Sequence, residues 1–308
     1  MKYAIGIDVG GTAIKYGIVS EKGTIVEESI VSTPTGSSEI SVVEQIQVCI
    51  QEMLGRCRTK KVHIQGIGIG IPGIVDKGVI IGCENLPELN GVILDRFFEN
   101  YFNIPVFLEN DANTMGISEI YFLQDKNIQD VVFLTIGTGI GGALVVNGNL
   151  YGGYRNRGAE FGHLMIDLNG PECKCGSRGC LEVMASIPAL LKMYNLMRPE
   201  IDKKIPIDGK FIIRKYLDKE EEAIEAFDLH FKYISVGIAS LINLFSPQKF
   251  IIGGGITESG DFYLNEIIHR VKKIVMKETS EFTVIERAKW GNKSGFLGAA
   301  ALVFIKNE

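Results

Sequence analysis

The hydrophobic positions at the start of this chain follow two patterns, one typical of strands and one typical of a helix. Runs rich in Val, Ile and Thr, interrupted by glycine turns, predict strands over Ala4–Val9, Ala13–Val19 and Thr24–Ser32. Apolar residues at helical spacing then predict a helix over Ser37–Cys57. A further strand over His63–Ile71 ends at a Pro-Gly pair. The opening of the chain is therefore predicted to be strands joined by short turns, with one helix among them.

The opening pattern returns in the middle of the chain. A predicted strand over Asp130–Ile136 leads into the turn Gly137-Thr138-Gly139, and a second strand covers Gly141–Val146 before the hairpin signal Asn147-Gly148. Strand, glycine turn and strand thus occur twice. This repetition predicts two related lobes, each presenting one phosphate-binding turn to a shared cleft.

Strands and helices alternate through the rest of the chain, which favours α/β layers over an all-β barrel. The remaining predicted strands are Ile104–Leu108, Lys249–Ile252 and Phe282–Glu286, and the remaining helices are Asn113–Phe122, Glu220–Leu244, Phe262–Met276 and Ser294–Ile305. The loosest stretch is Pro199–Gly209.

Composition narrows the class of protein. The chain has 308 residues, 46% hydrophobic and 22% charged, which is ordinary for a globular protein and enough for two lobes with separate cores. A net charge of −5 without a Lys/Arg block argues against nucleic acid as a partner. No apolar run reaches the roughly 18 residues of a membrane span, and the first residues lack a secretory pattern. We therefore expect a cytoplasmic protein without a membrane partner.

The first glycine turn follows a predicted buried strand that ends near an aspartate. Burying Asp8 is costly unless its carboxylate meets a cation or hydrogen-bond donors. Gly10-Gly11 lets backbone N–H groups approach a ligand closely, and Thr12 adds a hydroxyl. One interpretation is a phosphate loop in which Asp8 organises Mg²⁺, and the other is a hairpin with a turn-capping aspartate. The pattern is neither a Rossmann nor a Walker motif.

Two further glycine segments and one acidic segment follow predicted strands. Gly137–Gly142 is too rich in glycine for a plain hairpin, which favours a second phosphate turn. Gly253-Gly254-Gly255 precedes a predicted helix, where either a nucleotide or a tight strand–helix junction is expected. Glu109-Asn110-Asp111 also lies between a strand and a helix. A carboxylate there can face a ligand, but the position equally suits a helix N-cap.

One histidine and three cysteines form a compact metal-binding pattern, namely His163, Cys173, Cys175 and Cys180. They are a complete ligand set for tetrahedral Zn²⁺, whereas the alternative is a disulfide or chance clustering. Four protein ligands close the coordination sphere, so the predicted zinc is structural and holds a loop. Glu160 and Glu182 flank this segment.

Together these motifs resemble the ROK family (repressors, open reading frames, sugar kinases). The resemblance rests on Asp8-Val-Gly-Gly-Thr12, Glu109-Asn-Asp111, the Gly-Thr-Gly-Ile-Gly-Gly turn, Gly158-Ala-Glu-Phe-Gly-His163 and Cys-x-Cys-Gly-x-x-Gly-Cys-x-Glu, and it covers nearly the whole chain. It implies an α/β, actin-like ATPase (ribonuclease H-like) fold, with ATP and sugar between two lobes. We expect a small lobe of residues 1–112 plus 295–308 and a larger lobe of 113–294 with the zinc loop 163–180. A homodimer is implied by the resemblance alone.

The resemblance also implies roles for single residues. Asp111 would be the general base that accepts the proton of a sugar hydroxyl as its oxygen attacks the γ-phosphate of ATP, with Mg²⁺ neutralising charge. The implied sugar-binding residues are Asn85, Asn110, Asp111, Glu160, His163 and Glu182. The implied ATP- and phosphate-binding residues are Asp8, Gly10, Gly11, Thr12, Gly137, Thr138, Gly139, Gly254 and Gly255. His163 would hold zinc through one ring nitrogen and sugar through its other edge.

The expected activity is ATP-dependent phosphorylation of a hexose at its 6-hydroxyl. Glucose comes first and N-acetylmannosamine next, with fructose, allose or a β-glucoside as alternatives. The segment Glu84–Gly91 departs from the family pattern Pro-Asn-Leu-Pro-x-Trp because its aromatic is missing, so the sugar stays open. A sugar-sensing regulator of this family carries a winged helix-turn-helix, for which a first strand at residue 3 leaves no room. The retained Asp111 argues against a non-catalytic sugar-binding module.

Overall fold

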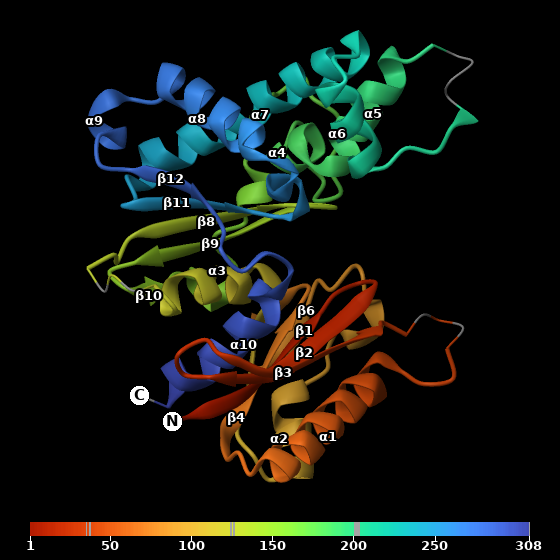
Figure 1. Ribbon diagram of the computed structural model, residues 1–308, viewed down its shortest axis with the longest axis vertical. Coiled ribbons are helices and arrows are strands. Elements are labelled where there is room, and N and C mark those ends of the chain that lie inside the picture. Colours follow the sequence, from red (N-terminus) through yellow and green to blue (C-terminus); the bar gives the residue numbers. More distant parts are fainter. Residues whose placement is uncertain (35, 37, 124, 126, 200–203, 308) are drawn as a thin grey trace. The chain divides into compact units, whose positions relative to one another are not determined.

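A computed structural model describes residues 1–307 except 35, 37, 124, 126 and 200–203 (Figure 1). The chain divides into two compact units. The first comprises Met1–Asn127, Ala143–Ala159 and Asn292–Glu308, and the second comprises Ile128–Gly142 and Glu160–Gly291. The lobe boundaries expected from the sequence, after residues 112 and 294, remain a prediction.

The first unit is built on a five-stranded sheet of order β3-β2-β1-β4-β7. Strands β1 (Tyr3–Val9), β2 (Ala13–Ser20) and β3 (Ile25–Ser32) form an antiparallel meander, and β4 (Ile64–Ile71) and β7 (Val106–Asn110) extend it in parallel with β1. A small hairpin of β5 (Ile74–Asp76) and β6 (Val79–Ile81) follows β4. The helices are α1 (Val42–Lys60), α2 (Leu94–Phe102), α3 (Asp111–Tyr121) and α10 (Ser294–Lys306), with a 3₁₀ turn at Pro87–Leu89.

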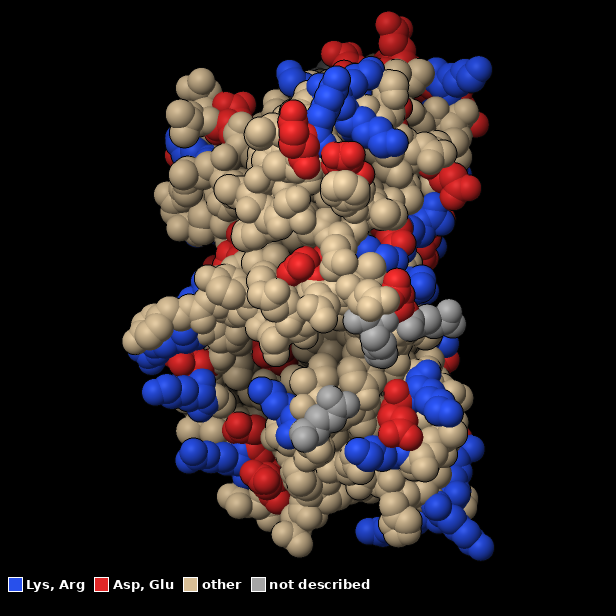
Figure 2. All heavy atoms as spheres, turned by 90° about the vertical axis from the view of Figure 1, so that its left-hand side faces the viewer, with Lys and Arg blue, Asp and Glu red and all other residues tan. Residues whose placement is uncertain are grey.

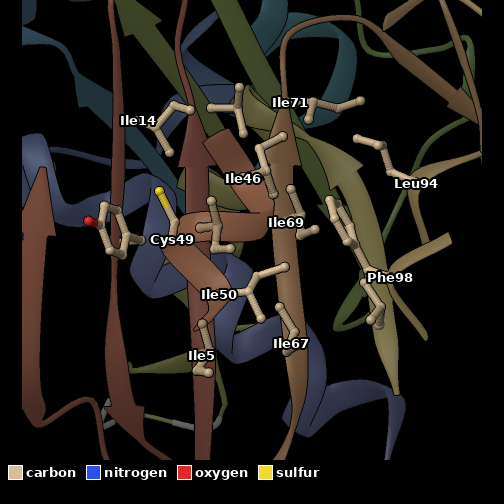
Figure 3. Close-up of a cluster of buried hydrophobic side chains, with 14 of the residues drawn as sticks. Ile5, Ile14, Ile46, Cys49, Ile50, Ile67, Ile69, Ile71, Leu94 and Phe98 are labelled. Atoms are coloured by element: carbon tan, nitrogen blue, oxygen red, sulfur yellow. The ribbon is translucent and has the colours of Figure 1, made fainter. Parts of the chain in front are cut away.

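The two faces of this sheet are packed by different means. On one face, isoleucines of β1 and β4 form an apolar core with α1 and α2, as Figure 3 shows for Ile5, Ile69 and Phe98. On the other face α10 lies directly against strand backbone, since a Cβ on Gly6 would come within 1.8 Å of the Phe296 carbonyl oxygen. A Cβ on Gly68 would likewise lie 1.7 Å from the Ala299 oxygen. The alternation of isoleucine and glycine in β4 therefore assigns one face to side-chain packing and the other to α10.

The second sheet has the order β10-β9-β8-β11-β12, which repeats the arrangement of the first. Strands β8 (Val131–Ile136), β11 (Lys249–Gly253) and β12 (Val284–Arg287) are parallel. The chain passes from the second unit to the first within β9 (Ile140–Val146), which pairs with β10 (Asn149–Leu150). Asn147 and Gly148 both have positive φ, 52° and 75°, as the predicted hairpin turn requires.

Helices of the second unit pack around one long central helix, α7 (Glu221–Phe245). The others are α4 (Leu181–Ala185), α5 (Ile187–Met197), α6 (Gly209–Leu217), α8 (Asp261–Ile274) and α9 (Lys277–Ser280), with 3₁₀ turns at Phe161–His163 and Gly255–Ser259. Two further 3₁₀ turns are Tyr154–Asn156, which belongs to the first unit, and Gly291–Lys293, which spans the boundary in sequence. His230 on α7 is fully buried, and its Nε2 lies 2.7 Å from the hydroxyl of Tyr263 on α8.

The predicted strands and helices are confirmed, with ends shifted by a few residues. The largest shift is in α1, which begins at Val42 because Ser41 and Glu44 form a reciprocal capping box. The predicted start, Ser37, lies outside the described residues, as does part of Pro199–Gly209. The sequence patterns did not predict α2, α4, α5, α6, α9 or the β5–β6 hairpin.

Two surface properties bear on partners. Lys and Arg side chains lie interspersed with Asp and Glu over the face shown in Figure 2. Among the described helices, none is both long and apolar enough to cross a membrane.

Candidate functional site

The first glycine turn joins β1 to β2 and stands beside a buried carboxylate. Asp8 is 7% exposed, and burial raises the pKa of its carboxyl to about 6, with Lys15 opposing the shift. A Cβ on Gly295 would lie 2.3 Å from the Asp8 carboxyl carbon, so the start of α10 reaches this carboxylate only because residue 295 is glycine. Gly11 and Thr12 are exposed. The turn thus combines accessible backbone with a carboxylate that a cation would stabilise.

Thr33 fixes the first turn from behind. Its hydroxyl donates to the Gly10 carbonyl oxygen at 2.6 Å, and its backbone N–H donates to the Thr12 oxygen at 3.0 Å. Thr33 is 5% exposed. No sequence pattern points to Thr33, because it follows β3 and its partners are separated from it by some twenty positions along the chain.

The carboxyl ends of three parallel strands meet at one edge of the first sheet. Asp8 pairs in register with Gly70, and Gly70 pairs with Glu109, so the predicted base segment stands at the same edge as the first turn. Asn110 is the N-cap of α3: its side-chain oxygen accepts from the Asn113 N–H at 3.1 Å, and its amide nitrogen donates to the Gly73 oxygen at 2.9 Å. The capping role foreseen as the alternative for this segment therefore belongs to Asn110.

Asp111 is the first residue of α3, and its carboxylate oxygen accepts from the neighbouring Ala112 N–H at 2.8 Å. Its charge contributes to the raised pKa of the buried Cys83 thiol, although burial is the larger cause. The half-buried carboxylate thus lies near the segment that contains Asn85. Asp111 stands at the positive end of a helix, where a carboxylate is a common residue.

Glu109 gathers three donors on a single oxygen. Oε1 accepts from the Asn110 N–H at 2.9 Å, from the Asn113 side chain at 3.0 Å and from the Asn156 side chain at 3.0 Å. Asn156 belongs to a loop that the sequence analysis left without a role. Glu109 therefore connects the end of β7, the start of α3 and this loop.

The segment without the family's aromatic residue is ordered by other means. Leu89 is fully buried, and the side chain of Asn90 accepts from the Cys83 N–H at 2.9 Å and donates to the oxygens of Cys83 and Pro87. Asn85 is exposed and packs against Gly11, where a Cβ would lie 3.5 Å from that of Asn85. This contact brings a predicted sugar-binding residue to the first phosphate turn.

Two glycine segments of the second unit lie together at the ends of β8 and β11. A Cβ on Gly254, whose φ is 98°, would come within 2.0 Å of the Ile136 carbonyl oxygen. The turn after Ile136 closes through a bond from the Gly137 N–H to the Gly139 oxygen at 2.9 Å, and the first N–H of α5 donates to the Gly137 oxygen. Thr138 is exposed. Gly137, Thr138, Gly139, Gly254 and Gly255 thus share one strand edge, where open α/β sheets bind nucleotides.

Glu182 ties the cysteine-rich segment to this turn. Its Oε2 accepts from the Ile140 N–H at 2.9 Å and lies where a Cβ on Gly139 would be. Glu182 and His163 also influence Glu160, whose carboxyl has a raised pKa because it is desolvated and because Glu182 repels its charge, while His163 acts in the opposite sense. The three predicted sugar-binding residues of the second unit therefore lie together.

The histidine and cysteine side chains have the spacing of a zinc site. Ligand atoms of His163, Cys173, Cys175 and Cys180 all lie within 4.8 Å of one another. Ideal tetrahedral geometry with Zn–S of about 2.3 Å and Zn–N of about 2.0 Å requires S···S of about 3.8 Å and S···N of about 3.5 Å. Cys175 Sγ lies 3.7 Å from Cys180 Sγ, and Cys173 Sγ lies 3.6 Å from His163 Nδ1. The residues fit zinc, and Nδ1 is the ring nitrogen that faces it.

The predicted residues therefore form two groups, one in each unit. The first contains Asp8, Gly10, Gly11, Thr12, Asn85, Asn110 and Asp111, and the second contains Gly137, Thr138, Gly139, Glu160, His163, Cys173, Cys175, Cys180, Glu182, Gly254 and Gly255. Their functional roles remain predictions.

Comparisons with known proteins identify the family and the fold of this chain. The ROK family profile matches residues 4–306. A glucokinase from Thermotoga maritima is 30% identical over 97% of this chain and 96% of its own length. A xylose repressor from Bacillus spizizenii is 31% identical over 98% of this chain and 77% of its own length. A crystal structure of a ROK family glucokinase from Streptomyces griseus, in complex with glucose and AMPPNP, has a TM-score of 0.81 and 29% identity, covering 97% of this chain and 98% of that one. The expected α/β, actin-like ATPase fold is confirmed.

Proposed function

The chain belongs to the ROK family, and on that premise we propose that it is an ATP-dependent kinase that phosphorylates the 6-hydroxyl of a hexose. The observation that carries this proposal is the position of Asp111, which begins α3 at the carboxyl edge of a parallel sheet while Asn110 caps the helix. Because Asn110 is the cap, capping does not account for the Asp111 carboxylate. Similarity to glucokinases supports the same conclusion.

In the proposed reaction Asp111 accepts the proton of the sugar hydroxyl as that oxygen attacks the terminal phosphorus of ATP. Phosphoryl transfer needs little covalent chemistry from the protein, so orientation of the nucleophile and neutralisation of charge dominate catalysis. Mg²⁺ bound with ATP would supply positive charge. The buried carboxylate of Asp8, with its raised pKa, is the residue that would organise this ion, directly or through water.

The two glycine turns would bind phosphate oxygens through backbone N–H groups, and Thr12 and Thr138 would add hydroxyl donors. Gly254 and Gly255 would lie beside the adenosine. Asn85, Asn110, Glu160, His163 and Glu182 would hydrogen-bond the sugar. Because Nδ1 of His163 lies beside Cys173 Sγ and would hold the zinc, the other ring nitrogen, Nε2, is the one that would meet a sugar hydroxyl.

Glucose is the proposed substrate, with N-acetylmannosamine, fructose, allose and β-glucosides as the alternatives to test. These sugars differ by one stereocentre or substituent, and Leu89 stands where the family pattern has its aromatic residue. The decisive experiment incubates the zinc-loaded protein with each sugar, ATP and Mg²⁺, and measures sugar phosphate and kcat/KM. If no hexose yields a 6-phosphate, the proposed function is wrong.

Similarity to xylose repressors supports a second candidate, a sugar-responsive regulator. The chain aligns with about three quarters of that repressor's length, 77%. A gel shift with operator-length duplexes, with and without sugar, distinguishes the two: sequence-specific, sugar-dependent binding would favour the regulator. A homodimer, proposed by the same family premise, is tested by light scattering.

A further inference from the structure

The loop Tyr151–Ala159 has an unusual backbone. Arg155, Asn156 and Ala159 have φ values of 56°, 58° and 61°, in the left-handed region that costs a non-glycine residue free energy. Asparagine tolerates this region better than arginine or alanine do. Gly152 leaves room for the loop to close, because a Cβ there would lie 1.9 Å from Asn156 Oδ1. A strained loop persists only where its surroundings hold it.

Two carboxylates of the first unit hold this loop. Asp76, whose side chain is 2% exposed, accepts from Arg155 at 2.7 Å and from Arg157 at 3.3 Å. Glu109 accepts from Asn156, whose amide nitrogen also donates to the Val75 oxygen at 3.2 Å. The arginine side chains are about half exposed, 49% and 45%, so water weakens their pairing with Asp76. The contact of Asn156 with Glu109 is more enclosed.

The same Glu109 oxygen binds the Asn110 N–H and the Asn113 side chain, which flank Asp111 in sequence. Loop and base segment therefore share one acceptor. Moving either partner away would leave a charged oxygen with an unfilled hydrogen bond, which is costly in a half-buried position.

We propose that Glu109 is a positioning residue that fastens the Tyr151–Ala159 loop to the segment carrying Asp111. Glu160 follows this loop directly in sequence, so release of the loop would loosen the backbone that leads into this predicted sugar-binding residue. Glu109 contacts no substrate in this scheme and acts through Asn110, Asn113 and Asn156. The kinetic part of the inference rests on the proposed kinase function, whereas the fastening of the loop does not.

The first experiment measures fastening without any reaction. Asn156→Gly deletes the side-chain amide while keeping a residue that accepts positive φ. Because Arg155 and Arg157 are trypsin sites, release of the loop should speed cleavage after them by about tenfold or more, the factor expected for a hydrogen bond to a charged group. Asn103→Gly is the matched control, since Asn103 also has positive φ, 54°, at the end of α2. Cleavage at Arg155 and Arg157 should be unchanged in that control.

The second experiment separates positioning from general stability. Glu109→Ala should raise the sugar KM and lower kcat, each by about tenfold. Asn156→Gly should raise KM and leave kcat close to wild type, since the bonds to Asn110 and Asn113 remain. Glu109→Gln keeps an acceptor oxygen and should rescue most of both losses.

The outcomes are distinct. Unchanged trypsin cleavage in both Asn156→Gly and Glu109→Ala would overturn the inference. Faster cleavage with unchanged KM and kcat would also overturn the positioning role. If the wild-type protein phosphorylated no hexose, the proposed function would fail, whereas faster cleavage in the two variants would still establish that Glu109 fastens the loop.

Discussion

The segments on either side of Glu160 are held by different chemistry. Before it, the Tyr151–Ala159 loop is fixed by Asp76 and Glu109 through hydrogen bonds and ion pairs within the protein. After it, the His163–Cys180 segment has side chains spaced for a zinc ion. The first arrangement is complete when the chain folds, whereas the second would be completed by an ion that its ligand spacing fits. A protein built this way can lose one support and keep the other.

The largest expected effect comes from a variant that should impair catalysis and leave both the Tyr151–Ala159 loop and the His163–Cys180 segment unchanged. Asp111→Asn should lower kcat by about 10²–10⁴-fold, because an amide cannot accept the proton of the sugar hydroxyl. Sugar affinity measured by calorimetry without ATP should change little. Trypsin cleavage at Arg155 and Arg157 and the zinc content should both match wild type. Normal turnover in this variant would remove Asp111 from the mechanism while leaving the comparison of the two segments intact.

Removal of zinc should affect the His163–Cys180 segment and leave the Tyr151–Ala159 loop unchanged. Chelation, or Cys180→Ser, should raise the sugar KM by about 10–100-fold. This is the range by which activity falls when the supporting residues of a metal site are changed. Far-UV circular dichroism should stay near native, because most helical residues, α7 among them, lie outside this segment. The control is Cys57→Ser, which changes a buried cysteine of α1, and the protein with this substitution should retain bound zinc. An unchanged KM after complete chelation would show that the sugar site does not depend on the ion.

Lowering the pH should test the core of the second unit separately from the His163–Cys180 segment. Burial lowers the pKa of His230 to about 3, below the ordinary value of 6.5. The unfolded chain therefore binds a proton that the folded chain excludes, and stability falls as pH drops below 6.5. Between pH 6.5 and 5 the loss from this group is about 2 kcal/mol. His230→Phe should flatten that pH dependence in urea titrations, although it costs stability at pH 7 by leaving the Tyr263 hydroxyl without its partner. An equal slope in both proteins would contradict the assignment.

The smallest expected effect concerns strain in the hydrogen-bonded loop. Ala159→Gly relieves a left-handed backbone that costs roughly 1–2 kcal/mol, and glycine's added flexibility when unfolded offsets about half of this. Stability should rise by about 0.5 kcal/mol in denaturant titration. Lys61→Gly, at the left-handed end of α1, should give a gain of the same sign. A loss in Ala159→Gly alone would mean that the alanine methyl contributes packing that exceeds its strain.

Several parts of the site could be predicted because their causes are local. The Cys-x-Cys spacing, the glycine turns after strands and the Asn147-Gly148 hairpin each depend on neighbours along the chain. The residue of Glu109-Asn110-Asp111 that caps the helix could not be identified from spacing, since either Asn110 or Asp111 suits a cap. The hydrogen bond from the Asn113 N–H to Asn110 identifies the cap in the structure, and the role of the Asp111 carboxylate stays a prediction.

The sequence by itself determined the order of most strands and helices, the positions of the glycine turns and the candidate metal-ligand set, because period, turn chemistry and ligand type act over a few residues. Only the tertiary structure decided that Asn156 meets Glu109, that Glu182 meets the Ile140 N–H and that Thr33 closes the first turn. These partners stand 47, 42 and 23 positions apart. Many donors and acceptors along the chain could pair with a given carboxylate or hydroxyl. Only folding selects which of them comes within 3 Å.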